Sequence, residues 1–250
     1  MDNPLYHLGQ TRSAQARNYF LLTPDTFVRT VLPGMVKAAG IVHISPASGA
    51  AFTQYTAELE AGGQLGFAAG QRFLYVLEGS IELEVSGRRH VLARRGFAYI
   101  PHTLGHTASA GVASRVAVIE KSYQPLGSAG APELIVSSEE AIDSHALGDD
   151  PDLQVRCMLP DHPSYDFAVN TMTYAPGAAL SMVEMHVMEH GLLMLEGGGI
   201  YRLGDSWYPT IAGDFIWMGP WCPQWFGAIG KKPAKYLIYK DWNRHPLDPR

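Results

Sequence analysis

An internal repeat restricts how this 250-residue chain can fold more than any other feature of its sequence. The segment LEGSIEL, from Leu77, aligns with LEGGGIYRL, from Leu195, 118 residues further on. Two more pairs have nearly the same offset: RGFAYIP aligns with AGDFIWM, and VIEKS aligns with IYKDW. Three pairs near one offset indicate a duplicated unit, so we expect two similar domains of roughly 110 residues each.

Both copies of the repeat consist of strand-like segments. Short stretches rich in Val, Ile, Tyr, Phe and Trp alternate with Gly and Pro, and long helical periodicity is nearly absent. The clearest helix signal is SSEEAIDSHAL, in which Ser137 and Glu140 have the spacing of a capping box. We therefore expect an all-β protein with an N-terminal barrel in residues 1–130, a C-terminal barrel in residues 131–250 and a short linker helix.

Charge and composition exclude several classes of protein. The net charge is -5 and Lys and Arg are scattered, so no basic stripe is available to bind nucleic acid. No run of about 18 apolar residues occurs, and the first residues lack the apolar core of a signal peptide. We expect a cytoplasmic protein without a membrane span, in which Cys157 and Cys222 are reduced thiols.

One stretch of the C-terminal copy carries three candidate metal ligands. Glu184, His186 and His190 have the spacing E-x-H-x3-H, and Gly197 follows seven residues later. Residues two apart in a strand face the same side, so Glu184 and His186 can reach one point, and a turn can bring His190 to it. The spacing alone also fits histidines that are hydrogen-bonded within a purely structural strand.

This stretch resembles the first conserved motif of the cupin superfamily, H-x-H-x3 or x4-E-x6-G, with the ligand types permuted. Glu184 stands at the place of the first histidine, His190 at that of the glutamate, and Gly197 closes the motif. The second cupin motif resembles GDFIWMGPWCPQW, from Gly213, where Gln224 replaces the usual histidine. With this ligand set the chain resembles, over nearly its whole length, the (S)-ureidoglycine aminohydrolases, two-barrel cupins (bicupins) of purine and allantoin breakdown.

The resemblance implies two tandem cupin barrels, which are jelly rolls of the double-stranded β-helix type, and a metal-dependent hydrolase. The reaction would convert (S)-ureidoglycine to (S)-ureidoglycolate and ammonia. The implied Mn²⁺ ligands are Glu184, His186, His190 and Gln224. The implied substrate contacts are Glu184, Tyr201, Gln224, Tyr236 and Lys240, with Glu184 and Lys240 as the catalytic groups. Two imidazoles, a carboxylate and an amide oxygen suit Mn²⁺ or Fe²⁺, and Zn²⁺ is also compatible. The resemblance also implies a homo-oligomer.

The N-terminal copy lacks the corresponding ligands. No His, Cys, Asp or Glu occurs from Ala61 through Leu77. His106 falls near the second-motif position, but a lone histidine does not hold a divalent ion tightly, so we expect a structural role for it. Lys121 is the repeat partner of Lys240, and we expect its replacement to have little effect.

Two other functions fit the same scaffold. A cupin dioxygenase would bind O₂ at Fe²⁺ or Mn²⁺, although its usual ligand set has a third histidine where Gln224 stands. A non-catalytic bicupin would sense or store a small molecule and keep only a vestigial site. Because cupins host many chemistries, the fold alone does not decide among these functions.

Overall fold

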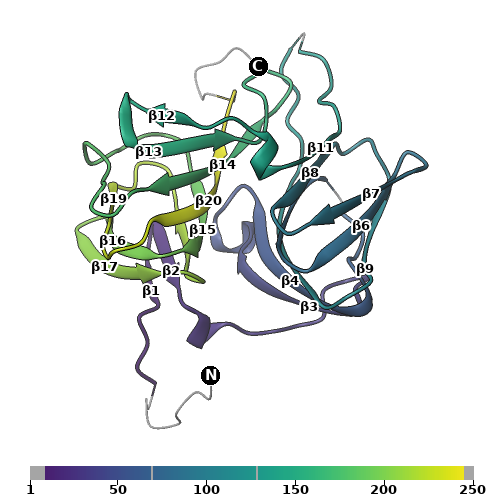
Figure 1. The fold of residues 1–250 in the computed structure, drawn as a ribbon, viewed down its shortest axis with the longest axis horizontal. Helices are drawn as coiled ribbons and strands as arrows, with labels where there is room; N and C mark the ends of the chain where they lie inside the picture. Colours follow the sequence, from purple (N-terminus) through teal and green to yellow (C-terminus); the bar gives the residue numbers. More distant parts are fainter. Residues whose placement is uncertain (1–8, 69, 128, 245–250) are drawn as a thin grey trace. The chain divides into compact units, whose positions relative to one another are not determined.

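The computed structural model describes residues 9–68, 70–127 and 129–244, in which regular structure is almost entirely β (Figure 1). The chain divides into two compact units. The unit called here the N-terminal barrel contains residues 28–143 and 159–166; the other, the C-terminal barrel, contains the described residues before 28, residues 144–158 and the described residues from 167 on. The predicted all-β class is therefore confirmed. Residues 1–8 and 245–250, which end the two expected domains, lie outside the described part.

The N-terminal barrel contains a nine-stranded sheet. Its path is β11-β8-β5-β10-β4-β9-β6-β7, and β3 pairs with β4. The strands are β3 (Val36–Ile44), β4 (Thr53–Gln64), β5 (Gln71–Glu78), β6 (Ser80–Val85), β7 (Arg88–Ala93), β8 (Gly96–Ile100), β9 (His106–Ala110), β10 (Ser114–Lys121) and β11 (Ile135–Ser138).

The C-terminal barrel contains an eight-stranded sheet of order β1-β2-β18-β15-β20-β14-β13-β12 and a three-stranded sheet of order β17-β16-β19. The strands are β1 (Ala14–Ala16), β2 (Tyr19–Leu22), β12 (His145–Leu147), β13 (Asp150–Cys157), β14 (Phe167–Tyr174), β15 (His190–Glu196), β16 (Gly198–Leu203), β17 (Ser206–Ile211), β18 (Phe215–Met218), β19 (Gln224–Ala228) and β20 (Ala234–Asp241).

The two barrels repeat one topology. The order β8-β5-β10-β4 in the N-terminal barrel matches β18-β15-β20-β14 in the C-terminal barrel, and β6, with its partners β7 and β9, matches β16, with β17 and β19. The strands that match are the ones that carry the repeated sequence segments. The duplication inferred from the sequence is therefore a duplication of structure.

The glycine of the repeated LEG segment has a backbone reason in both copies. Gly79 and Gly197 have φ of 73° and 66°, in the left-handed region that favours glycine. A Cβ atom at Gly79 would meet the carbonyl oxygen of Ala113, and one at Gly197 would meet that of Pro233. The chain can make this turn between consecutive strands only where no side chain is present.

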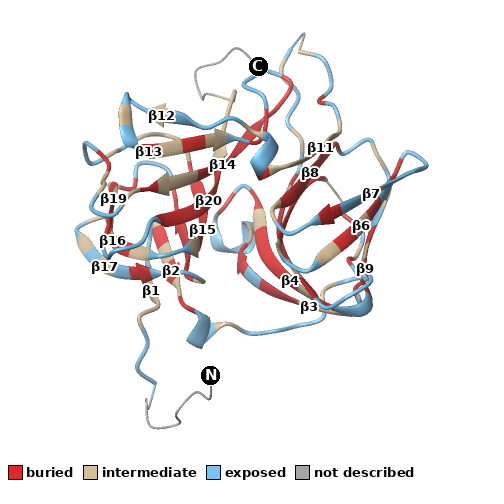
Figure 2. Cartoon of the chain, viewed as in Figure 1, coloured by how far each residue is buried: buried red, intermediate tan, exposed pale blue. Residues whose placement is uncertain are grey.

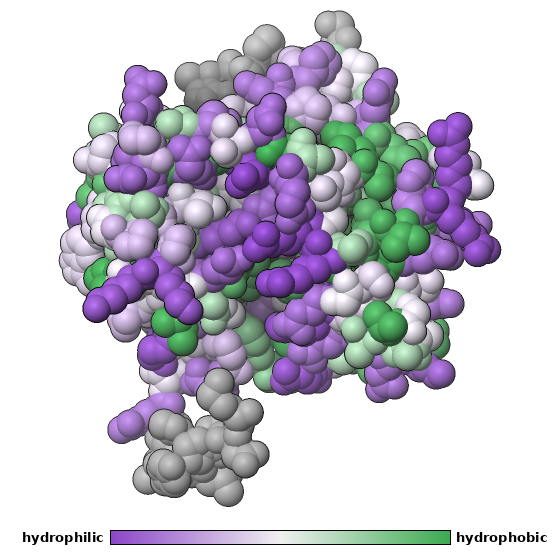
Figure 3. All heavy atoms as spheres, in the orientation of Figure 1, coloured by the Kyte–Doolittle hydropathy of each residue, from purple (hydrophilic) through white to green (hydrophobic). Residues whose placement is uncertain are grey.

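Alternation of side chains builds the core of each barrel (Figure 2). In β6, Ile81, Leu83 and Val85 are buried while the residues between them are not, as expected for a strand with one face turned to the core. In β16, Tyr201 and Leu203 are buried in the same way. Hydrophilic residues cover most of the face drawn in Figure 3. No helix in the described residues is long and apolar enough to cross a membrane.

The N-terminal segment belongs to the C-terminal barrel, which differs from the division expected at residue 130. Strand β2 pairs with β18, with Tyr19 opposite Met218 and Leu22 opposite Phe215. Arg12 also binds the same segment to this barrel. Its guanidinium donates to both carboxylate oxygens of the fully buried Asp214, at 2.7 and 2.8 Å. Long-range pairing of this kind leaves no local trace in the sequence.

Two further segments also fall in the N-terminal barrel, beyond the expected boundary. Strand β11 pairs with β8. Asp166 lies in the segment 159–166, and its carboxylate accepts hydrogen bonds from the Lys121 ammonium, at 3.1 Å, and from the backbone N–H of Gln124, at 2.9 Å. The N-terminal barrel therefore includes β11 and the segment 159–166, both of which lie beyond the expected boundary at residue 130.

The expected linker helix is a single three-residue 3-10 turn, Glu139–Ala141. Ser137, assigned to the capping box, instead lies in β11 opposite Phe97, where the sheet uses its backbone. Glu139 is buried and accepts a hydrogen bond of 2.6 Å from the Tyr75 hydroxyl. Tertiary pairing has overridden the local helix signal. Cys157 and Cys222 are not joined in a disulfide.

The attachment of the N-terminal segment can be tested with Arg12→Met. Removal of the guanidinium leaves the buried Asp214 carboxylate with less compensation, which we expect to destabilise the C-terminal barrel by about 2 kcal/mol. All five tryptophans lie between Trp207 and Trp242, so tryptophan fluorescence during urea unfolding reports on that barrel. Arg17→Met, at an exposed position of the same segment, is the control. Equal unfolding midpoints for the two variants would contradict the assignment.

Candidate active site

The C-terminal barrel encloses a cavity of about 250 Å³ above its apolar core. All seven site residues expected from the sequence line this cavity: Glu184, His186, His190, Tyr201, Gln224, Tyr236 and Lys240. Its apolar walls include Val155, Met172, Leu180 and Ile238. A small polar group of residues thus meets at one point inside a mainly apolar enclosure, as is common for small-molecule sites.

Two imidazoles face each other at the centre of the polar group. His190 begins β15 and is buried, and His186 lies in the loop before it. Their Nε2 atoms are 3.3 Å apart. His186 Nδ1 lies 3.2 Å from the carbonyl oxygen of Met188, and His190 Nδ1 lies 3.3 Å from that of Tyr239. A carbonyl can only accept, so each Nδ1 donates to its carbonyl oxygen, and each Nε2 is directed at the other ring.

This orientation of the rings is the one that metal-binding histidines adopt. A backbone carbonyl on the far ring nitrogen fixes the tautomer and directs the other nitrogen at the ion. Two nitrogens bound at about 2.1 Å to one ion lie roughly 3.0–3.4 Å apart, which agrees with the observed separation of 3.3 Å.

The other two expected ligands are held together by the backbone. Glu184 and Gln224 exchange backbone hydrogen bonds of 2.9 and 3.0 Å, which fixes the loop before β15 to the start of β19. The Gln224 amide nitrogen lies 2.8 Å from His186 Nε2, and rotation of the amide would bring its oxygen to the same place. The Glu184 carboxylate stands 3.9 Å from His186 Nε2 and is 39% exposed.

The arrangement is compatible with a divalent cation although it is not closed around one. In the described residues, no group of three or more His, Cys, Asp or Glu side chains is gathered as a metal centre, because Glu184 stands off. The two imidazoles and the Gln224 amide already converge, and the partly exposed Glu184 side chain has room to move towards them. The donor set of two imidazole nitrogens, one amide oxygen and one carboxylate fits Mn²⁺ or Fe²⁺.

Burial keeps His190 neutral. Removal from solvent lowers the pKa of His190 to about 3, and the neighbouring His186 and Lys240 act in the same direction. A neutral imidazole is the form that binds a metal ion. At neutral pH this ligand therefore needs no proton release before a cation binds.

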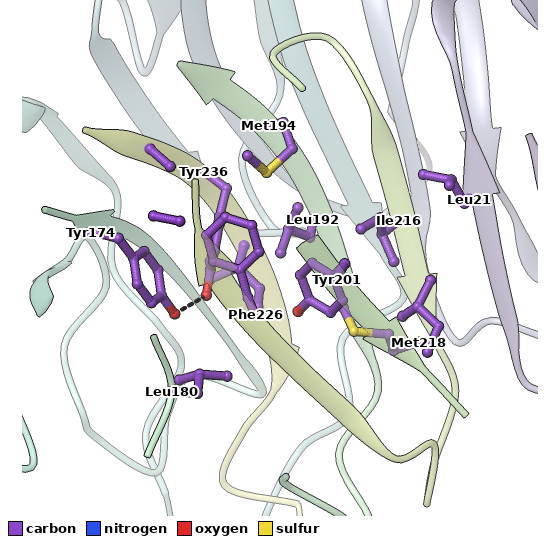
Figure 4. Close-up of a cluster of buried hydrophobic side chains, with 14 of the residues drawn as sticks. Leu21, Tyr174, Leu180, Leu192, Met194, Tyr201, Ile216, Met218, Phe226 and Tyr236 are labelled. Carbon is purple, nitrogen blue, oxygen red and sulfur yellow. Dashed lines mark hydrogen bonds between the residues drawn. The ribbon is translucent and has the colours of Figure 1, made fainter. Parts of the chain in front are cut away.

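Tyr201 and Tyr236 line the cavity. Figure 4 shows both rings in the buried cluster of the C-terminal barrel, together with Tyr174. The hydroxyls of Tyr236 and Tyr174 are 2.7 Å apart, and both rings are buried. Burial raises the pKa of Tyr201 and Tyr236 well above the usual value, so both hydroxyls keep their protons. The Tyr201 hydroxyl has no hydrogen-bond partner among the described residues. Tyr174 was not expected from the sequence; its period-two spacing from Met172 is the signal that places it on the inner face of β14.

Lys240 lies beside the imidazoles. It is directly opposite His190 in the pairing of β20 with β15. Its ammonium also lies 4.5 Å from the centroid of the Trp242 ring, a cation–π contact. Trp242 lines the cavity as well and was not among the residues expected from the sequence.

The N-terminal barrel has a different interior at the equivalent place. His106 begins β9 as Gln224 begins β19, and it contacts a buried arginine, Arg72, with His106 Nε2 3.0 Å from Arg72 Nη1. Arg72 is paired with Glu120 at 2.6 Å. Burial and the Arg72 charge lower the pKa of His106. A guanidinium and its carboxylate thus stand where the C-terminal barrel gathers its imidazoles.

Lys121, aligned with Lys240 in the sequence, is not its structural counterpart, because Glu120 pairs with Arg72 as Lys240 pairs with His190. Its ammonium is buried and donates to the backbone carbonyl of Asp166 at 2.8 Å as well as to the carboxylate at 3.1 Å. Loss of one partner of a buried ion pair costs about 3–5 kcal/mol. Replacement of Lys121 was expected to have little effect, but the buried ion pair indicates that it would lower the stability of the N-terminal barrel.

Comparison with known proteins identifies similar sequences and structures. Residues 170–239 match the cupin domain family. The (S)-ureidoglycine aminohydrolase of Arabidopsis thaliana is 40% identical over 96% of this chain and 80% of its own length; that of Escherichia coli K12 is 31% identical over 91% and 89%. The crystal structure of a protein from Pseudomonas aeruginosa described as glyoxylate-induced superposes with a TM-score of 0.86 at 30% identity, covering 95% of this chain and 93% of that one.

More distant structures share the fold alone. A Bacillus subtilis oxalate decarboxylase with Mn(II) centres superposes with a TM-score of 0.67 at 12% identity, over 94% of this chain and 80% of that one. The cupin fold predicted from the two motifs is therefore confirmed. Since the named relatives match more than nine-tenths of the sequence at 31% identity or above, the chain belongs to the (S)-ureidoglycine aminohydrolase family of cupin proteins.

Proposed function

We propose that this protein hydrolyses (S)-ureidoglycine to (S)-ureidoglycolate and ammonia in purine and allantoin breakdown, with a divalent cation held by Glu184, His186, His190 and Gln224. The activity named for its relatives supports the reaction. The observation that carries the cation is the pair of imidazole nitrogens 3.3 Å apart in the cavity. Mn²⁺ is the proposed ion, ahead of Fe²⁺ and Zn²⁺.

When bound, the cation would polarise substrate atoms and stabilise developing negative charge. Lys240 supplies the ammonium that pairs with the substrate carboxylate, and its contact with the Trp242 ring limits how far the ammonium can move. Tyr201 and Tyr236 keep their protons and donate hydrogen bonds, which orients the substrate within the apolar walls. The partly exposed Glu184 carboxylate can exchange protons with water and with the leaving amino group.

The proposed partners follow from the same features. The substrate is a small molecule, and the dispersed charge gives no support for nucleic acid binding. We propose a homo-oligomer, which agrees with the exposure of large apolar side chains such as Phe67 and Val28. A cytoplasmic location agrees with two free thiols.

Metal binding should be visible as thermal stabilisation. At a Mn²⁺ concentration about 100 times the dissociation constant, linkage stabilises the native state by about 2.7 kcal/mol, so we expect the melting temperature to rise by about 5 °C or more. His186→Ala should abolish this rise because it removes the nitrogen that contacts both His190 and Gln224. His102→Ala, at an exposed histidine of the N-terminal barrel, should retain it. A rise of the same size in both variants would contradict the assigned ligands.

Gln224→His tests the unusual fourth ligand. Imidazole binds these ions more strongly than an amide oxygen, so we expect metal affinity to be kept or increased while kcat falls about 10-fold or more as the charge and shape of the site change. Calorimetric metal titration and steady-state kinetics measure the two effects separately. Metal affinity and kcat lost together would show that Gln224 supports the fold rather than the ion.

Lys240→Met removes the proposed cation for the substrate carboxylate. We expect kcat/KM to fall about 100-fold or more, with metal content and melting temperature unchanged. Lys232→Met, at an exposed lysine just before β20, is the matched control and should retain activity. Lys121→Met is unsuitable as a control because it breaks a buried ion pair. Equal activity of the two lysine variants would contradict the role of Lys240.

The reaction itself should be stereospecific. With the carboxylate, the ureido group and the amino group each in a separate part of the cavity, we expect ammonia release from the S enantiomer and none from allantoate, which has a second ureido group in place of the amino group. The assay generates ureidoglycine in place from allantoate with a separate enzyme and follows the chirality of the ureidoglycolate. Racemic product at the uncatalysed rate from Mn²⁺-loaded protein would rule out the aminohydrolase and favour a dioxygenase or a binding protein.

A further inference from the structure

One polar side chain of the cavity has no role in the site described above. Asn170 lies in the middle of β14 and is only 4% exposed, and it lines the cavity. Its side-chain amide has no hydrogen-bond partner among the described residues. Its polar atoms are not among the fully buried unpaired ones, so they open onto the cavity, where a ligand group can complete their hydrogen bonds.

The register of the sheet fixes where this amide lies. Asn170 is directly opposite Ile238 on β20, and Ala168, two residues earlier on the same face of β14, is opposite Lys240. Asn170 is therefore one row of side chains away from Lys240 and from His190, which pairs with Lys240 on the other side of β20. A molecule of a few atoms that contacts Lys240 can also reach Asn170.

The surroundings of Asn170 restrict what it can bind. Met172, the next residue on the same face of β14, and Ile238, across the sheet, are apolar cavity residues. An asparagine side chain offers an acceptor oxygen and a donor NH₂ in one plane, and a ureido group presents the same two functions in one plane. The pair can form two hydrogen bonds, whereas a carboxylate could use only the donor.

We propose that Asn170 is a specificity-determining residue that hydrogen-bonds the ureido group of the substrate while Lys240 pairs with the substrate carboxylate. This inference rests on the proposed function. It divides the cavity into a carboxylate end beside His190 and a ureido end on β14. A site whose amide is complemented by the ligand discriminates strongly against analogues that leave the amide unpaired.

The test is a binding cycle that needs no turnover. N-carbamoylglycine carries the carboxylate and the ureido group but no amino group to release, and 4-methylpentanoate has the same shape with carbon in place of the ureido oxygen and nitrogens. Calorimetry on Mn²⁺-loaded wild-type protein should give at least about 10-fold tighter binding of N-carbamoylglycine than of 4-methylpentanoate. In Asn170→Leu, which keeps the branched shape of the side chain without its polar atoms, this preference should disappear or reverse.

Stability separates recognition from a structural role. Replacement of an unpartnered buried amide by an apolar side chain of similar shape should leave the melting temperature unchanged or higher. Asn170→Ala provides a second variant with the amide removed and no added bulk, and should lose the same preference. An unchanged preference in both variants, or weaker binding of both probes together with a lower melting temperature, would overturn the inference. Failure of wild-type protein to release ammonia from (S)-ureidoglycine would instead count against the proposed function.

Discussion

The approach of two imidazole nitrogens to 3.3 Å is the constraint on which the candidate site of the C-terminal barrel depends. Each ring is held in this orientation by a backbone carbonyl on its far nitrogen, and for His190 that carbonyl belongs to Tyr239 on β20. The pairing that sets this contact also places Lys240 opposite His190. The register of β15 against β20 therefore sets both the geometry of the proposed metal ligands and the position of the Lys240 ammonium, which we propose to bind the substrate carboxylate.

The duplicated chain shows how one topology can carry two different interiors. In the N-terminal barrel, Arg72 and Glu120 form an internal ion pair that His106 contacts. A guanidinium supplies positive charge at this place in the N-terminal barrel. In the C-terminal barrel, the described residues that line the cavity include no arginine, and His186 and His190 meet there instead. The proposed chemistry therefore uses one copy of the fold.

Sequence reasoning succeeded where the information is local or repeated at a fixed offset. The alignment of Leu77 with Leu195 located the duplicated strands, and the spacing of Glu184, His186 and His190 placed all three on one cavity. Permuted ligand types did not hide the motif, because the spacing and the closing glycine follow from the backbone path. Gly197 is required by its positive φ whichever metal ligands precede it.

The features that the sequence did not predict depend on partners far along the chain. Strand β2 pairs with β18, nearly 200 residues away, so the N-terminal segment could not be assigned to its barrel. The capping-box spacing at Ser137 was overridden by pairing with β8. Lys121 and Lys240 end equivalent strands but lie on opposite faces of them, because Glu120, opposite Arg72, takes the place of Lys240, opposite His190. The sequence offset is one residue out of register at this point, and only strand pairing reveals it.

Anomalous X-ray scattering from crystals grown with Mn²⁺, measured on both sides of the manganese absorption edge, tests the central claim most directly. The account predicts one manganese peak per chain, within about 2.0–2.3 Å of Nε2 of both His186 and His190, with Glu184 and Gln224 completing the ligand set. It predicts no peak beside Arg72. A manganese peak in the N-terminal barrel, or one in the C-terminal barrel that is not bonded to both imidazoles, would contradict it.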